Sequence, residues 1–565
     1  MKKIELLAPV GSLANLKAAI VGGADSVYLG MNKFSARNYA TNFNDNYLKQ
    51  AINLCKSNKV KLYLTMNTLV KNDEIEEFFK YLSYAYSCGI DSVIIQDISL
   101  LRIIKDNFPD LKVHLSTQAG IMNSFHANLL KRADRINLAR ELKKSEIQHI
   151  RNNFRKELEV FVHGALCVCL SGSCLFSSFL GGRSGNRGRC AQPCRKKYDG
   201  CYYLSTKELC LAKEIPSIVR SGVDSVKIEG RMRSPYYVNN TVSIYGNLID
   251  DYYKGRFKVT DEILKKLESG FSREFTQGNF SSECVFNRKT ATGTSEIVKR
   301  IYEVKSSNFR SKRESIKVKL PPIESKESKK QLLVRVYNRE DALIADSNGA
   351  DVIYLDIYDN DFSSVKSQIK CKLFAVTPRL MFDSDTDEIK KLIDEKKPDG
   401  ILAGNLGVLG FGLNIPIHLD YNINCFNDLD LDYYGNVFPL ISPELNFKEL
   451  SNFKNKNFGV LVHGKIRLMS LRHELKEGWI KDEKDCKFLV FKVKNGSEII
   501  NEKELGFFNK CNFLIENGLK SFFIDTDNNV SEIVSLYRSI LDGKKVNDSK
   551  IRKKYVLGWS FKGVQ

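Results

Sequence analysis

Short β-branched or apolar runs alternate with helical patterns through the first 230 residues, and this alternation limits the fold more than any other feature of the chain. Such alternation is typical of βα units that pair into a parallel sheet. Because eight βα units close a barrel, we predict an α/β fold with an N-terminal (β/α)8 TIM-like barrel. The eight predicted strands span residues 4–7, 26–29, 61–64, 92–95, 112–115, 135–138, 159–162 and 225–228.

Polar residues follow these strands at the end that would form the mouth of the barrel. In such barrels, the residues just past the carboxyl end of each strand face the active site. A polar ring of this kind suits a small-molecule or nucleotide site, although each member alone is also compatible with a loop cap. The ring contains Asn67, Asp97, Gln118, Arg140, Glu141, His163, Glu229 and Arg231.

The second half of the chain repeats the first. Residues 6–29 return as residues 332–355 at a constant spacing of 326 positions, 160–164 recur as 460–464, and 222–229 are echoed by 518–525. Three matches in the same order predict a second, degenerate barrel-like α/β half. We therefore expect a barrel over 1–260, a connector with short strands over 261–330, the second half over 331–545 and a basic tail over 546–565.

The composition narrows the classes of protein. No apolar run approaches the roughly 18 residues needed to cross a bilayer. Glu5 and Pro9 interrupt the first residues, which fit a strand better than a signal peptide. We therefore expect a cytoplasmic protein with no membrane partner. The formal net charge of +20 fits either a polyanionic partner, because each cation near a phosphate releases a counterion, or a solvated lysine-rich surface.

Cysteines are concentrated in one loop region. The chain has 14, and seven of them lie between residues 167 and 210, after the seventh predicted strand. Without a secretion signal, this usage favours metal or redox chemistry over disulfides. Cys167, Cys174, Cys190 and Cys194 are the candidate ligands of a 4Fe–4S cluster or of a four-thiolate zinc site. Their spacing alone does not choose between these sites, and free thiols are the third alternative.

The cysteine-rich loop is also basic. Six cationic side chains and no acidic one lie between Arg183 and Lys197. They fit three roles: neutralising a thiolate-ligated cluster, binding phosphate, or simply facing solvent. The second half lacks this chemistry, because no cysteine follows His463 as Cys167 follows His163. We expect that half to have lost catalysis and kept a basic scaffold.

At these residues the sequence resembles the collagenase-like peptidase family 32, whose catalytic type is unknown. The family signature has the form E-x-F-x-x-G-[SA]-[LIVM]-C-x(4)-G-x-C-x-[LIVM]-S, and Phe176 departs from its aliphatic position. Further blocks that resemble the family span residues 7–11, 23–25, 67–69, 116–118, 188–195 and 227–231 and cover the first half. The signature maps onto Glu159, Phe161, Gly164, Ala165, Leu166, Cys167, Gly172, Cys174 and Ser177.

The resemblance does not by itself imply proteolysis. Members of the family include oxygen-independent hydroxylases that carry a 4Fe–4S cluster. The long type, similar to this chain, hydroxylates a cytidine of large-subunit ribosomal RNA, and shorter types act on a transfer RNA uridine, with prephenate linked to the reaction, or on the ubiquinone ring. The resemblance implies iron–sulfur rather than zinc at the four cysteines. It also implies that Cys201 or Cys210 could replace Cys194 as the fourth ligand.

Roles for the remaining candidates follow from their chemistry. Arg140, Lys227 and Arg231 are predicted to hold a dicarboxylate such as prephenate by charge-assisted hydrogen bonds. His163 and Glu229 are the candidate catalytic groups for proton transfer. The alternative for His163 is a core histidine that closes its strand, since His463 persists without cysteines, and the alternative for Lys227 is a structural pair with Glu229. Asn67, Gln118 and Arg183 complete the predicted substrate contacts, and an electron donor is a further expected partner.

Two other functions compete with RNA hydroxylation. A zinc peptidase would need a motif such as His-Glu-x-x-His, but the second histidine is missing after His473, and no Gly-x-Ser-x-Gly motif is present. A cysteine peptidase that pairs Cys167 or Cys174 with His163 stays open. A non-catalytic RNA-binding module with a structural metal would share the basic charge and the duplicated scaffold.

Overall fold

The structure, a computed structural model, describes residues 3–38, 40–269, 274–283, 285–286, 301–544, 555–558, 560 and 562–564. The chain divides into two compact units. Unit 1 consists of Met1–Gly172, Ser184–Leu320 and Asp482–Lys484. Unit 2 consists of Ser173–Arg183, Pro321–Lys481 and Asp485–Gln565.

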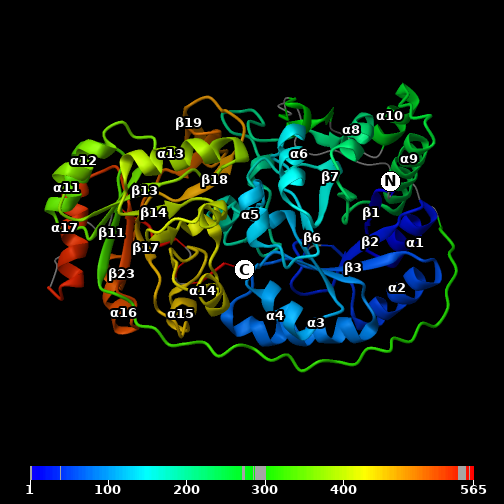
Figure 1. Cartoon of the computed structure of the whole chain (residues 1–565), viewed down its shortest axis with the longest axis horizontal. Coiled ribbons are helices and arrows are strands. Elements are labelled where there is room, and N and C mark those ends of the chain that lie inside the picture. Colours follow the sequence, from blue (N-terminus) through cyan, green and yellow to red (C-terminus); the bar gives the residue numbers. More distant parts are fainter. Residues whose placement is uncertain are drawn as a thin grey trace. The chain divides into compact units, whose positions relative to one another are not determined.

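Unit 1 is built around a closed barrel of eight parallel strands (Figure 1). The first seven pair in chain order, and the eighth, β9, pairs with both β7 and β1 and closes the barrel. The predicted TIM-like barrel is thus confirmed. The strands are β1 (Glu5–Pro9), β2 (Ser26–Gly30), β3 (Lys61–Met66), β4 (Ser92–Ile95), β5 (Lys112–Leu115), β6 (Arg135–Asn137), β7 (Glu157–Ala165) and β9 (Ser225–Ile228).

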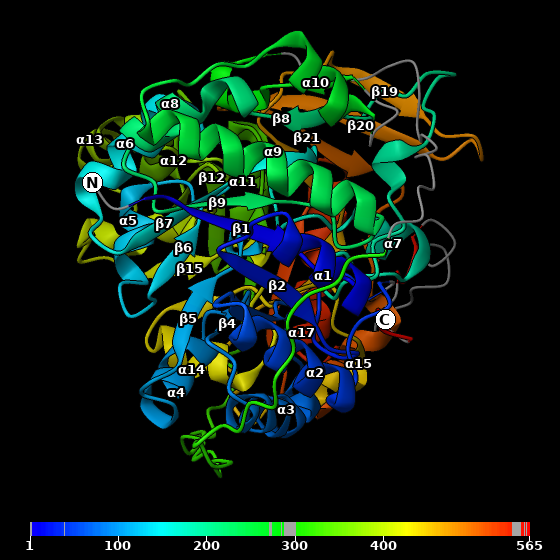
Figure 2. The same cartoon turned by 90° about the vertical axis from the view of Figure 1, so that its right-hand side faces the viewer.

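Helices surround this barrel, with α9 packed against α1 (Figure 2). Helix α1 shows why they begin and end where they do: the side chain of Ser12 accepts a hydrogen bond from the amide of Asn15, and Gly22 follows the last turn. The helices are α1 (Leu13–Val21), α2 (Asp45–Ser57), α3 (Ile75–Cys88), α4 (Leu100–Asn107), α5 (Ser124–Leu129), α6 (Lys144–Asn153), α8 (Ile215–Arg220), α9 (Pro235–Tyr253) and α10 (Asp261–Glu268).

The interior of the barrel is partly filled by a buried ionic network. Arg135 forms ion pairs with Glu5 at 2.8 Å and with Glu159 at 3.2 Å, and Glu159 also accepts a hydrogen bond from Lys227. Tyr63 donates to Glu5. Because buried charges are tolerated only when they are paired, this network requires all its members to be present together.

Strand β7 contains a β-bulge just before the loop that carries the cysteines. Phe161 pairs with Lys227, but the next partner of β9, Ile228, pairs with His163, so the register shifts by one residue. A bulge re-aims the following side chain. Past the bulge, β8 (Glu208–Cys210) runs antiparallel to β7, and β10 (Phe275–Thr276) pairs with β8.

Unit 2 contains the predicted second barrel-like half. Its parallel strands run in the order β16-β15-β14-β13-β12-β11-β23-β17, and one bridge between Leu440 and Gly459 links β16 to β17. The antiparallel β22 (Leu505–Gly506) pairs with β17, as β8 does with β7. The strands are β11 (Gln331–Arg335), β12 (Val352–Asp356), β13 (Lys372–Val376), β14 (Gly400–Ala403), β15 (Ile417–Leu419), β16 (Phe438–Pro439), β17 (Val460–Gly464) and β23 (Ser521–Asp525).

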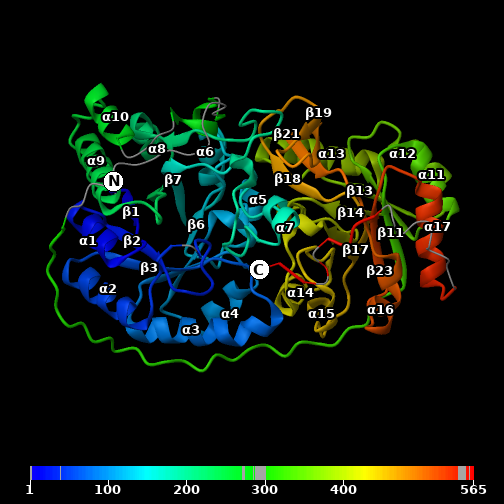
Figure 3. The ribbon, with the colours of Figure 1, turned by 180° about the vertical axis from the view of Figure 1, so that it is seen from behind.

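A separate four-stranded antiparallel sheet follows β17, at the place in the chain where cysteines follow β7. Figure 3 shows it in orange at one end of the strands of unit 2. Its strands are β18 (Arg467–Leu471), β19 (Gly478–Lys481), β20 (Lys487–Val493) and β21 (Gly496–Asn501). The helices of unit 2 are α7 (Phe176–Gly181), α11 (Arg339–Ser347), α12 (Phe362–Gln368), α13 (Thr386–Lys396), α14 (Asp428–Tyr434), α15 (Phe447–Ser451), α16 (Cys511–Glu516) and α17 (Val530–Leu541).

The described part of the connector from residue 301 to Leu320 is an extended segment of unit 1 that follows α2, α3 and α4 (Figure 1). Its backbone amides bond to side chains of these helices, for example Phe309 to Asn53 and Ile316 to Ser83. Most of the predicted basic tail, 546–565, lies outside the described residues. Across the described parts of the chain, no helix combines the length and the apolar character that a membrane span needs.

Candidate active site at the mouth of the first barrel

Glu229 marks the mouth of the barrel, directly after β9. Its carboxylate accepts hydrogen bonds from Nη2 of Arg37 at 3.2 Å and from Nε at 3.4 Å. The Glu229 side chain is 13% exposed, so it is shielded but reachable. The Glu229 carboxylate raises the pKa of Arg37.

Asn67 and Gln118, from the loops after β3 and β5, lie together at this mouth. Nδ2 of Asn67 donates to Oε1 of Gln118 at 3.1 Å. Gly172 lies in the cysteine-rich segment, residues 167–210, and approaches the backbone of Gln118. A Cβ atom at Gly172 would lie 1.8 Å from the carbonyl oxygen of Gln118. Gly172 also has a φ of +88°, which only glycine adopts without strain. This contact explains the glycine of the signature and fixes the segment against the mouth.

Two arginines brace the backbone around Cys167. Arg140 donates to the carbonyl of Ala165 at 3.2 Å and to the hydroxyl of Ser171 at 2.8 Å, on either side of that cysteine. Arg195 donates to the carbonyl of Leu166 at 3.1 Å. Because Arg195 directly follows Cys194, this bond joins the Cys194 turn to the Cys167 segment. Arg140 therefore stabilises the loop through protein partners, in addition to its predicted contact with a ligand.

The described residues do not form a metal site as they are placed. No group of three or more His, Cys, Asp or Glu side chains in the described ranges lies where it could hold a metal ion. Cys174 and Arg183 belong to Ser173–Arg183, a segment that is grouped with unit 2, whereas the other three candidate ligands belong to unit 1. The four thiols thus share donor chemistry suited to iron or zinc, but neither unit alone contains all four.

The other two predicted cations are held inside unit 1. Nζ of Lys227 lies 3.1 Å from Glu159, deep in the barrel, rather than pairing with Glu229, and burial lowers its pKa. Arg231 is 4% exposed and donates to Ser35 and to Asn42, and burial lowers its pKa to about 10. The structure therefore does not gather Arg140, Lys227 and Arg231 into one open cationic pocket.

His163 lies on the helix side of β7. Its side chain is 0% exposed, and its Nδ1 lies 3.2 Å from the hydroxyl of Tyr245 on α9. The ring also packs against Tyr237 and Phe275. Burial lowers the pKa of His163 to about 3, so the imidazole is neutral at physiological pH. The catalytic role of His163 stays a prediction, and this placement favours Glu229 as the proton-transfer group.

Arg37 is the residue of this site that the sequence did not single out. It lies in the loop after β2, and only its contact with Glu229, 192 positions away, shows its role. In the sequence, Arg195 stands out only as one of six cations in the loop. The sequence signal that could have identified Arg37 and Arg195 is their position in loops that follow the carboxyl ends of barrel strands.

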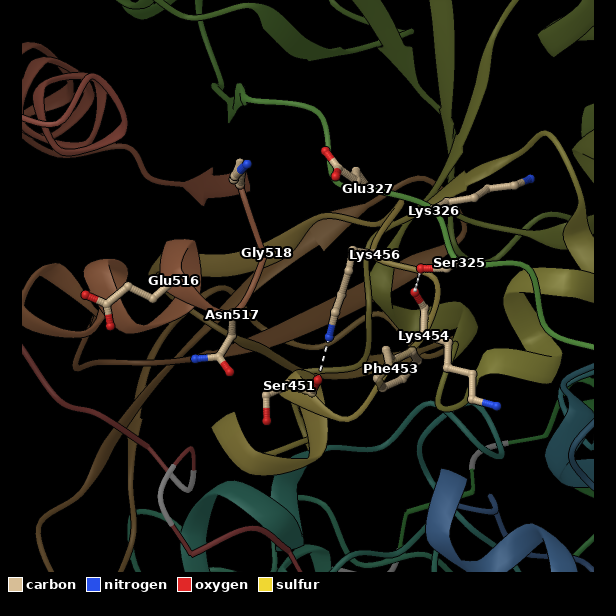
Figure 4. Close-up of a pocket in the computed structure, with 11 residues that line it drawn as sticks. Ser325, Lys326, Glu327, Ser451, Phe453, Lys454, Lys456, Glu516, Asn517 and Gly518 are labelled. Carbon is tan, nitrogen blue, oxygen red and sulfur yellow. Dashed lines mark hydrogen bonds between the residues drawn. The ribbon is translucent and has the colours of Figure 1, made fainter.

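Another pocket lies in unit 2 and has a volume of about 470 Å³. Its lining includes four lysines, but Figure 4 shows that Lys326 and Lys454 point away from one another and from Lys456. Nζ of Lys456 donates to the carbonyl of Ser451. This pocket opens near the amino ends of β17 and β23, the end of a barrel that serves stability rather than chemistry.

Comparison with known proteins identifies the family. The family model of peptidase family U32 matches residues 11–288, which include seven of the eight strands of the first barrel, all but β1. An uncharacterised protease of Methanocaldococcus jannaschii is 38% identical over 300 residues, which are 49% of this chain and 73% of the relative. The chain belongs to peptidase family U32.

Other relatives of this U32 chain are named for RNA modification. The tRNA hydroxylation protein P1 of Bacillus subtilis is 33% identical over 294 residues, which are 48% of this chain and 70% of the relative. The 23S rRNA 5-hydroxycytidine C2501 synthase of Escherichia coli is 33% identical over 261 residues, which are 44% of this chain and 39% of the relative. The recognition of the family from its signature is thus confirmed.

Proposed function

We propose that this chain hydroxylates RNA at the mouth of its first barrel. Two of its relatives are named for hydroxylation of transfer RNA and ribosomal RNA, and their similarity covers about half of this chain. The observation that carries the proposal is the position of the cysteine-rich segment, which Arg140 and Arg195 hold beside Glu229 at the carboxyl end of the strands. In barrels of this type, that end is where chemistry occurs.

Within this site, the residues of the chain have separate roles. Glu229 accepts or returns a proton at its Oε atoms, and Arg37 holds that carboxylate in place. Asn67 and Gln118 present amide groups that can pair with the edge of a base. Lys227 neutralises the charge of Glu159 inside the barrel and does not contact the substrate.

We further propose that Cys167, Cys174, Cys190 and Cys194 hold a 4Fe–4S cluster, with zinc as the alternative. When bound, such a cluster would supply electron transfer or an open iron position. Cys201 stays a candidate for the fourth ligand. Cys210 fits less well, because its sulfur lies 3.8 Å from the hydroxyl of Tyr245, on the helix side of β7.

A small dicarboxylate such as prephenate is proposed as the metabolite linked to hydroxylation, with no use of dioxygen and with a separate electron donor. Arg140 and Arg231 are its candidate contacts. Each keeps one buried N–H, at Nε, with no hydrogen-bond partner among the described residues. Such groups favour an anionic acceptor because an unpaired buried donor is costly.

A cytidine of large-subunit ribosomal RNA is the favoured target, because the chain has the long, duplicated form, and a transfer RNA uridine is the second candidate. The test is mass mapping of nucleosides from ribosomal and transfer RNA of a deletion strain, complemented with wild-type chain or with Glu229→Gln. We expect one nucleoside to lose the mass of a single oxygen atom on deletion and to regain it only with the wild type. An RNA pool that deletion leaves unchanged would exclude the proposal.

Proteolysis is the alternative function, since one relative is named a protease. A nucleophilic cysteine would need an accessible histidine beside it, and His163 is 0% exposed. A gelatin or casein assay with chelator controls separates proteolysis from hydroxylation. A non-catalytic RNA-binding module would instead bind RNA and leave its nucleosides unchanged.

A further inference from the structure

A second, smaller pocket of about 130 Å³ lies at the mouth of the barrel-like half of unit 2. Its polar side consists of Tyr337, Lys465, Arg467, Asp525 and Asp527. Its apolar side is formed by Leu489 and Phe491 on β20 and by Ile500 on β21, where Leu489 and Ile500 are directly paired across the strands. The four-stranded sheet therefore gives the pocket a flat apolar wall opposite a polar edge.

The polar edge is electrically balanced. Lys465 pairs with Asp527 at 3.1 Å, and Nε of Arg467 lies 3.6 Å from Asp525. Behind them, Glu498 pairs with the other end of the Arg467 guanidinium and with Arg379, whose Nε lies 3.8 Å from Glu498. Because no cation is left in excess, the pocket does not favour a phosphate or a dicarboxylate, which need uncompensated positive charge. The balance favours an uncharged ligand that both donates and accepts hydrogen bonds.

Two buried atoms on this edge keep open hydrogen-bonding capacity. Arg467 is 4% exposed and Asp525 is 3% exposed, yet Nε of the first and Oδ2 of the second have no hydrogen-bond partner among the described residues. Their separation of 3.6 Å is too long for a hydrogen bond. Both atoms are buried beneath the pocket, so the donor and the acceptor that a ligand can reach on this edge are Lys465 and Asp527, whose side chains are 16% and 47% exposed.

The apolar side suits a flat ring. The guanidinium carbon of Arg467 lies 5.6 Å from the centre of the Tyr337 ring and 5.5 Å from that of Phe491, so two aromatic rings lie near this guanidinium. A cavity of about 150 Å³ holds one benzene ring, and the volume of this pocket, about 130 Å³, is close to that. The pocket therefore has the size and the surfaces for one planar heterocycle stacked on aromatic and guanidinium planes.

The position of the pocket follows from the duplication. Arg467 stands four residues after His463, as Cys167 stands four residues after His163, and Asp525 ends β23 where Glu229 follows β9. The mouth of the second half thus lies at the equivalent position of the fold, with the guanidinium of Arg467 where the first half has the thiol of Cys167. The exchange leaves the second mouth without a thiol at this position.

We propose that this pocket binds a single nucleobase of an RNA, so that the second half reads a base while the first carries out the chemistry. The proposal rests on the proposed function in one respect: RNA is taken as the source of the base because the chain is proposed to hydroxylate RNA. Its physical basis is the paired donor and acceptor of Lys465 and Asp527, the neutral edge and the apolar wall. An unpaired base can enter it, whereas a phosphate or a dicarboxylate is disfavoured.

The test is equilibrium binding of free cytidine, uridine and adenosine to the purified full chain, followed by saturation-transfer NMR, with prephenate and ribose 5-phosphate as comparison ligands. We expect saturable binding of at least one nucleoside. Ile500→Trp, which fills the cavity, should weaken it by at least about tenfold, and Phe491→Ala should weaken it severalfold. Lys492→Ala is the control, because Lys492 neighbours Phe491 on β20 and its side chain is 55% exposed.

Three results would overturn the proposal: no saturable binding of any nucleoside, equal binding by wild type and by both pocket variants when thermal unfolding shows them folded, or a preference for prephenate that Ile500→Trp abolishes. Failure of the proposed function is separate. It is read from nucleoside masses in the deletion strain, which do not depend on affinity for free nucleosides.

Discussion

The hydroxyl of Tyr245 accepts a hydrogen bond from Nδ1 of His163 at 3.2 Å, because the single proton of that hydroxyl goes to the carbonyl of Val162 at 2.9 Å. The second half repeats this arrangement: Tyr537 donates to the carbonyl of Val462 at 2.7 Å and its ring packs against His463. Both histidines follow a β-bulge that turns them towards a helix. The shared geometry favours a structural role for both histidines.

Removing the Tyr245 hydroxyl should therefore affect stability more than activity. Tyr245→Phe leaves the buried Nδ1 donor of His163 without this acceptor, and we expect a loss of about 1–3 kcal/mol in the free energy of unfolding. Hydroxylation per folded molecule should stay within about threefold of wild type. Urea unfolding and product mass measure the two effects. Tyr252→Phe is the control on the same helix, since the Tyr252 hydroxyl makes no hydrogen bond among the described residues; equal stability of both variants would contradict the prediction.

Buried histidines should make the protein sensitive to mild acid. Burial lowers the pKa of His163 and of His418 to about 3 and that of His126 to about 4, against about 6.5 when unfolded. Below pH 6.5 the unfolded chain therefore binds protons that the folded chain does not, and stability falls as pH falls. The steepest contribution of each histidine is about 1.4 kcal/mol per pH unit.

The measurement is the free energy of unfolding in urea between pH 7.5 and 5.0. His126→Leu should flatten the dependence, because both ring nitrogens of His126 lack hydrogen-bond partners among the described residues, so the variant removes a titrating group without removing a bond. Above pH 7 the two proteins should show little pH dependence from this source. A profile for His126→Leu parallel to the wild type would refute the assignment.

Glu229→Gln should abolish hydroxylation while preserving the fold. The amide cannot take up a proton at the mouth, and loss of a general base typically lowers rates by about 10²–10⁴-fold. The side chain is still able to accept a hydrogen bond from Arg37. Nucleoside mass spectrometry gives the activity, and Glu262→Gln, at an exposed position on α10, is the control. Wild-type activity in Glu229→Gln would remove this residue from the chemistry.

Metal content should follow the proposed cysteines. In protein purified without oxygen, Cys167→Ser, Cys174→Ser, Cys190→Ser and Cys194→Ser should each lose most of the iron and sulfide per chain. Cys486→Ser, which changes an exposed cysteine outside this set, should keep both. Zinc in place of iron would identify zinc as the bound metal. Full iron content in any of the four variants would exclude that cysteine as a ligand, and Cys201→Ser would then be the next variant to assay.

Gly172→Ala should displace the cysteine-rich segment. A methyl group there would lie 1.8 Å from the carbonyl oxygen of Gln118, and the left-handed φ adds a cost of about 1–2 kcal/mol. We expect lower stability and strongly reduced hydroxylation. Gly181→Ala is the matched control, because a methyl group at Gly181 would meet nothing within 4 Å beyond its own helix backbone and chain neighbours. Equal activity of the two variants would show that the contact with Gln118 is dispensable.

The periodicity of the sequence was enough to predict the scaffold of strands and helices. Strands and helices depend on local alternation and on caps, so the eight predicted strands overlap the strands of the first barrel, and the duplication predicts a second parallel set of strands. The signature around Cys167 likewise identifies the family from the order of its residues alone. These features depend on residues that are close together in the chain.

The partners of individual side chains were decided only by the tertiary structure. Lys227 pairs with Glu159, His163 turns to Tyr245, and Arg37 reaches Glu229, over separations of 68, 82 and 192 residues. A bulge in β7 and the closure of the barrel set these contacts, and neither leaves a periodic trace in the sequence. Local patterns fix which residues form strands, whereas strand register and loop packing determine which charges meet.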